Sequence, residues 1–73
     1  MTRIEEIYEF ALPEMKENNI DDTPQNRVEF LQGLYDSWEE DEDVSLEKTF
    51  YMLALQVELF RLELDLSIPK NLG

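Results

Sequence analysis

The side chains of this chain best suited to chemistry are carboxylates, because it holds 18 aspartates and glutamates but no histidine and no cysteine. Seven of these acids lie between Asp36 and Glu47, and no basic residue separates them. Carboxylates can coordinate calcium or magnesium, exchange protons when one of them is desolvated, or bind the basic surface of another protein. Each of these three roles makes a different demand on the sequence.

The sequence does not meet the demands of metal binding or catalysis. If Asp41 and Asp43 are aligned with the first two ligands of an EF-hand loop, Leu46 falls where glycine is needed. Acid–base work requires a desolvated carboxylate in a cleft, and a chain of 73 residues leaves little room for one. Nucleophilic catalysis lacks its commonest base and its best nucleophile. We therefore expect no enzymatic activity, no metal site and no cofactor.

Protein binding is the role that the acids fit best. The net charge of −12 repels phosphates and anionic lipid, so we expect no direct nucleic-acid binding and no membrane binding. Carboxylates on successive helical turns lie about 5 to 6 Å apart, close to the spacing of phosphates along a nucleic-acid strand, and can compete for lysines and arginines. The predicted binding surface, called the acidic face, comprises Glu29, Asp36, Glu39, Glu40, Asp41, Glu42, Asp43 and Glu47.

Two aromatic residues are candidates for anchoring a partner at the acidic face. Trp38 lies within the acidic segment of the sequence, and Phe10 points toward the acidic side of its predicted helix. Buried aromatic anchors dominate the binding energy of many interfaces. Trp38 also fits the apolar stripe of its own helix, so the alternative is that it belongs to the core.

In size and charge the chain resembles the small acidic proteins with which phages block host nucleases, restriction enzymes or CRISPR effectors. This resemblance extends to no motif. It implies a non-catalytic inhibitor or modulator of a basic, nucleic-acid-handling protein. The competing hypothesis is a structural or assembly protein, or a small regulatory subunit, in which the charge only provides solubility. Its working surface would be one apolar stripe of the C-terminal helix, formed by Tyr51, Met52, Leu55, Leu59, Leu62 and Leu66.

Helix signals at three places predict one all-helical domain over residues 1–73. The capping box Thr2-Arg3-Ile4-Glu5 begins a first helix, which Pro13 should kink or split. Thr23 is a good cap for a second helix over about residues 24 to 39, and Ser45 for a third helix that opens at residue 46. No apolar run approaches the roughly 18 to 20 residues of a membrane span, and we expect a soluble, cytoplasmic protein.

The third helix carries two apolar stripes on nearly opposite sides, at about 100° per residue. The first stripe is Leu46, Phe50, Leu53, Val57, Phe60 and Leu64, and the second stripe is Tyr51, Met52, Leu55, Leu59, Leu62 and Leu66. Residues 61–68 also alternate like a strand, but leucine, glutamate and arginine favour helix and no breaker intervenes.

Two apolar stripes on one helix require two surfaces to cover them. Small folds without disulfides or metals usually gain stability by association. We therefore predict a homodimer that packs through the second stripe. The alternative is that the first two helices flank the third on opposite sides and bury both stripes within one chain.

Overall fold

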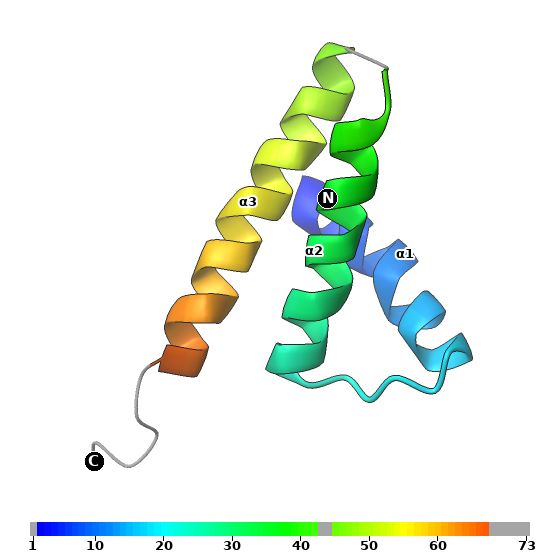
Figure 1. Ribbon diagram of the computed structural model, residues 1–73, viewed down its shortest axis with the longest axis vertical. Helices are drawn as coiled ribbons and strands as arrows, with labels where there is room; N and C mark the ends of the chain where they lie inside the picture. Colours follow the sequence, from blue (N-terminus) through cyan, green and yellow to red (C-terminus); the bar gives the residue numbers. More distant parts are fainter. Residues whose placement is uncertain (1, 43–44, 68–73) are drawn as a thin grey trace.

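The computed structural model describes residues 2–42 and 45–67, and these ranges fold into three helices without a strand (Figure 1). Helix α1 spans Arg3–Glu17, α2 spans Pro24–Glu40 and α3 spans Leu46–Ser67. The predicted all-α fold is thus confirmed. The strand alternative is wrong for residues 61–67, which belong to α3, and residue 68 lies outside the described residues. Pro13 lies inside α1, and a kink there stays a prediction.

Local capping bonds explain where the helices begin. Thr2, Thr23 and Ser45 each accept a hydrogen bond from the backbone N–H three residues later, at 3.3, 3.1 and 3.2 Å. These bonds satisfy N–H groups that have no partner within the helix. After α1, Asn19 adopts a left-handed conformation with φ of 58°, which asparagine tolerates better than most residues. The helix boundaries therefore follow from short-range chemistry.

The core lies where α1 and α2 meet one side of α3 (Figure 1). It is small, and each helix contributes to it. Its buried apolar members are Ile7, Ala11 and Met15 of α1, Leu31 of α2, and Leu55, Leu59 and Leu62 of α3. The part of α3 that enters the core is therefore the second stripe.

This arrangement corrects the prediction that the second stripe faces another copy. Leu55, Leu59 and Leu62 are between 0 and 7% exposed, because α1 and α2 both pack on that side of α3. Tyr51 and Met52 of the same stripe are half-buried, and Leu66 is exposed.

The first stripe is the one that α1 and α2 leave largely exposed, although Arg3 at the amino end of α1 lies over the ring of Phe50. Its six members are between 40 and 70% exposed. The alternative in which the first two helices bury both stripes is therefore wrong as well. None of the helices in the described ranges combines the length and apolarity needed to cross a membrane.

Candidate functional site

The described members of the acidic face all lie at the surface. Their side chains are exposed from α2 through the start of α3: Glu29, Asp36, Glu39, Glu40, Asp41, Glu42 and Glu47. Asp43, the remaining predicted member, lies outside the described residues. The acidic face is thus available to a partner over its whole described extent.

Three of these acids form a row on the outward side of α2. Glu29, Asp36 and Glu40 are spaced by seven and four residues, which places them on one side of a helix and spreads them over about 16 Å. Between described residues, none of the three takes part in an ion pair, although Gln32 donates a hydrogen bond of 3.1 Å to Asp36. We call these three residues the acidic row.

Beyond the acidic row, the chain turns back toward α3. The ammonium group of Lys48 donates a hydrogen bond of 2.8 Å to the backbone carbonyl of Asp41 and so ties the end of α2 to the beginning of α3. Trp38, Glu47 and Tyr51 line a shallow hollow of about 320 Å³ beside this contact. The hollow combines polar and apolar groups next to the acids.

The two predicted aromatic anchors border the same hollow. Trp38 packs edge-on against Tyr51, with ring centroids 6.4 Å apart, and is partly buried against the core. Phe10 is 51% exposed. Phe10, Trp38 and Leu34 line a second and largely apolar hollow of about 250 Å³. Trp38 therefore serves the core and also borders a surface that an apolar side chain can enter.

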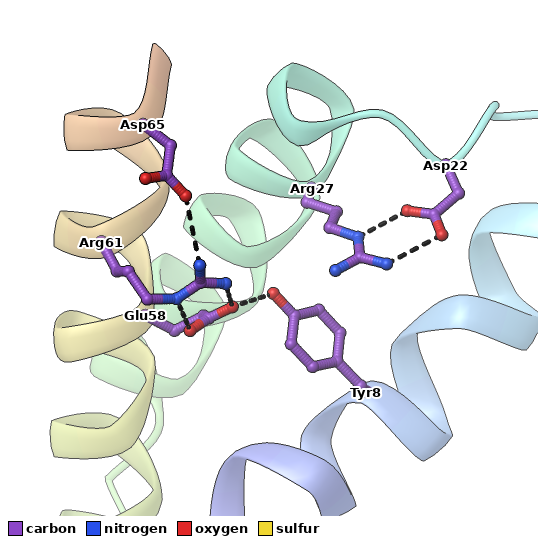
Figure 2. Close-up of polar contacts among 6 residues, drawn as sticks. All are labelled: Tyr8, Asp22, Arg27, Glu58, Arg61 and Asp65. Carbon is purple, nitrogen blue, oxygen red and sulfur yellow. Dashed lines mark hydrogen bonds and ion pairs between the residues drawn. The ribbon is translucent and has the colours of Figure 1, made fainter. Parts of the chain in front are cut away.

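A network of charged groups crosses from α1 to α3 at a different place (Figure 2). Glu58 is the one buried charged residue in the described ranges, at 7% exposure. Its carboxylate accepts a hydrogen bond from the Tyr8 hydroxyl and two from the Arg61 guanidinium, at 2.9 and 2.6 Å. Arg61 also reaches Asp65 at 3.2 Å. The buried carboxylate is thus fully compensated by donors.

One face of the Tyr8 ring is covered from α2. The Arg27 guanidinium lies 4.7 Å from the centre of the Tyr8 ring, and it donates a hydrogen bond of 2.8 Å to Asp22 (Figure 2). A cation over an aromatic face is attracted by the ring electrons. The network therefore connects all three helices around one tyrosine.

The electrostatics of this network suit a structural contact. Burial and the neighbouring Glu58 raise the pKa of Tyr8 to about 12. The hydrogen bonds from Arg61 lower the pKa of the Glu58 carboxyl. Both shifts move the pKa values of these groups further from neutral pH, whereas a general acid or base works best with a pKa near the operating pH. What the arrangement does chemically is to hold α1 on α3.

This network was not predicted from the sequence, because Glu58 lies between the two stripes of the third helix, where a charged residue is ordinarily exposed. The available signal was an acid at the edge of the second stripe, followed one turn later by Arg61. A charge that interrupts an apolar face indicates a buried pair. The partner on α1 could not be identified in this way, since 50 residues separate Tyr8 from Glu58.

Within residues 2–42 and 45–67, no three acidic side chains converge on a point where they could hold a metal ion. The candidate site is therefore a surface, composed of the acidic row, the neighbouring acids and the two hollows that Trp38 lines. The chain matches no protein-family model, and no curated protein or solved structure shows significant similarity to it.

Proposed function

We propose that the chain is a non-catalytic protein–protein interaction module that inhibits or modulates a basic, nucleic-acid-handling protein. The observation that carries this proposal is the acidic row, in which Glu29, Asp36 and Glu40 are exposed along one side of α2 without an ion pair to a described residue. Such a row offers carboxylates to lysines and arginines that otherwise contact phosphates.

The position of the acids along α2 supports a role in binding. Asp36, Glu39 and Glu40 occupy the last turns of the helix, where the helix dipole favours cations and each anion costs roughly 0.3 to 1 kcal/mol at low salt. The last turn of α2 holds no basic residue of its own, and the ammonium group of Lys48 offsets part of this cost from α3. A locally unfavourable charge pattern is expected more often at a functional surface than in a purely structural one.

The largely apolar hollow of about 250 Å³ gives the proposed partner a second contact. Phe10 and Trp38 border this hollow, which lies next to the acidic end of α2. A partner segment with an apolar side chain among lysines or arginines would fill the hollow and meet the acids together. Acidic groups would then steer the encounter, and the apolar contact would slow dissociation. Because such partners act on nucleic acids inside the cell, we place this function in the cytoplasm.

Affinity capture with a polyanion competitor tests the proposal. The chain is immobilised, mixed with a host lysate treated with nuclease, and then washed with duplex DNA. We expect a basic protein to be retained by the chain and released by the DNA, because both compete for the same cationic groups. The double variant Asp36→Lys, Glu40→Lys should not retain that protein.

A charge-matched variant separates the acidic row from the overall charge. Glu9→Lys with Glu17→Lys alters two exposed acids of α1. Each double reversal adds four charge units, from −12 to −8, so both variants have the same net charge. Retention by the α1 variant and loss by the α2 variant would support the proposal. Equal loss in both, or a captured protein that DNA does not release, would overturn it.

A second candidate function is a structural or assembly protein, or a small regulatory subunit. The exposed first stripe on α3 favours it, since six large apolar side chains in water mark a contact surface. If this candidate is correct, Leu53→Glu should abolish the function of the protein. The double variant Asp36→Lys, Glu40→Lys should leave it intact. The two candidates are therefore distinguished by which face must stay intact.

A further inference from the structure

The first stripe has the spacing of a coiled-coil seam. Its successive members are separated by 4, 3, 4, 3 and 4 residues, which is the alternation of the a and d positions of a heptad repeat. The a positions are Phe50, Val57 and Leu64, and the d positions are Leu46, Leu53 and Phe60. The second stripe has the same alternation from Met52 to Leu66, but α1 and α2 already bury it at Leu55, Leu59 and Leu62. The first stripe therefore has a spacing suited to packing on a further helix and, unlike the second, is left exposed within the chain.

The charges of α3 lie off the first stripe. The helix carries four acids, Glu47, Glu58, Glu63 and Asp65, and the helical period places all four on its flanks or on its core side. A chain with 18 acids has thus kept a strip the length of α3, about 33 Å, free of carboxylates. Solubility alone would favour the opposite pattern.

The fold leaves room for a second helix along this strip. Both α1 and α2 pack on the core side of α3, so α3 forms the outer edge of the molecule (Figure 1). A helix of matching length and matching heptad spacing is present in every other copy of the chain. We propose that α3 of a second copy covers the first stripe, antiparallel to it, in a symmetric homodimer.

The antiparallel orientation follows from charge. A parallel pair would place the two acidic faces side by side at one end of the dimer, where like charges repel. An antiparallel pair places them at opposite ends of a helix of 22 residues. With the two first stripes fully overlapped, Glu47 lies beside Arg61 of the second copy, twice by symmetry, and Ala54 lies beside its own equivalent. In this register no two like charges face each other along the seam.

One hollow on the surface has the composition of a central hole in such a seam. It measures about 350 Å³, and its wall on α3 consists of Phe50, Leu53, Ala54, Val57 and Glu58. The first four occupy positions i, i+3, i+4 and i+7, which are the positions that surround a knob in coiled-coil packing. In the antiparallel register the knob is Val57 of the second copy. Val57 is 70% exposed, the highest value among the large apolar side chains described.

The amino end of α1 borders the same hollow. Arg3 lies 4.7 Å above the ring of Phe50 and, with Ile4, lines the side of the hollow that faces α1. This contact fixes one wall of the hole in the single chain. The inference goes beyond the leading proposed function, because the first stripe shares no residue with the acidic row, and it names an occupant for the contact surface on which the second candidate rests.

Light scattering of the purified chain at increasing concentration tests the dimer. We expect twice the mass of one chain, and Val57→Glu should return it to the mass of one chain with an unchanged helical circular dichroism signal. Leu66→Glu is the matched control, since Leu66 is an exposed leucine of the same helix outside the first stripe. The control should keep the dimer. A wild-type monomer at every concentration, or dissociation by both variants, would overturn the proposal.

A label at Ser67→Cys tests the orientation, since the chain has no cysteine of its own. In the antiparallel register the two labels are about 36 Å apart along the helix axes, at 1.5 Å per residue. We expect a spin-label distance in this range and no disulfide between the copies. A short distance, or ready disulfide formation under oxidation, would show a parallel pair and overturn the proposed register.

Discussion

The two stripes of α3 have similar side chains and opposite environments. In the second stripe, Leu55 is fully buried, whereas Val57, two residues later in the first stripe, is 70% exposed. The polar residues at the two edges of the second stripe form hydrogen bonds to the two helices that cover it. Glu58 accepts a hydrogen bond from Tyr8 of α1, and Gln56 donates one of 2.7 Å to Tyr35 of α2. Both stripes favour burial because they are apolar, but the hydrogen bonds at the polar edges favour burial of the second stripe within the chain.

The largest effect that separates the stripes should come from Leu55→Ala. Removing this side chain leaves a cavity in a core with few buried residues, and such changes cost about 2 to 5 kcal/mol of unfolding free energy. Urea denaturation followed by circular dichroism measures the loss. Leu53→Ala, in the first stripe, is the control and should cost far less in a monomer. Equal losses for the two variants would contradict the assignment of Leu55 to the core.

The sequence was sufficient for the helices because their signals are local. Thr2, Thr23 and Ser45 form their capping bonds within three residues, so no knowledge of the tertiary structure is needed. The sequence could not show which stripe is buried, because helical periodicity gives both stripes equal weight. The hydrogen-bond partner of Glu58 at the edge of the second stripe is Tyr8, which lies 50 residues away in the chain.

The candidate site shows the same division. Charged residues on a helix are expected to be exposed, and the exposure of the acidic face was therefore predictable from the sequence. The meeting of Phe10 with Trp38 at one hollow was not, since it depends on how α1 crosses α2. Local chemistry placed the acids, and packing between helices placed the aromatic side chains.

A smaller effect is expected from Glu58→Gln, which tests the edge toward α1. The change keeps the size of the side chain but removes the charge that Arg61 and Tyr8 satisfy, and it should cost about 1 to 3 kcal/mol. Thermal unfolding by circular dichroism provides the measurement. Glu63→Gln removes an exposed charge from the same helix and should change the stability by no more than about 0.5 kcal/mol. An unchanged stability of the Glu58→Gln variant would show that this edge does not hold α1.

Alkaline pH should weaken the same edge by about 1 to 2 kcal/mol. Folding raises the pKa of Tyr8 from 10.0 to about 12, so the folded state holds this proton more tightly than the unfolded state. Its contribution is fully present below pH 10 and is lost as the pH rises toward 12. One pKa unit corresponds to about 1.4 kcal/mol, and the partial exposure of the ring reduces the total.

Tyr8→Phe is the control for this pH dependence, because it removes the titrating hydroxyl. The variant should start less stable and lose less on going to high pH. A remaining slope is expected from Tyr51, whose pKa is also raised, mainly by its hydrogen bond to Glu6. Identical pH profiles for the wild type and the variant would exclude the contact between Tyr8 and Glu58 as their source.

The smallest effect should come from Val57→Gln, and its small size is informative. An exposed valine contributes no burial to a single chain, and glutamine is the better helix former, because valine loses rotamer freedom in a helix. The unfolding free energy of the monomer, measured at a concentration too low for association, should therefore change by less than about 0.5 kcal/mol. At higher concentration the wild type should gain stability from dimer formation, and the variant should not. A large loss in the monomer would instead mean that the first stripe is covered within the chain, and the contrast between the two stripes would disappear.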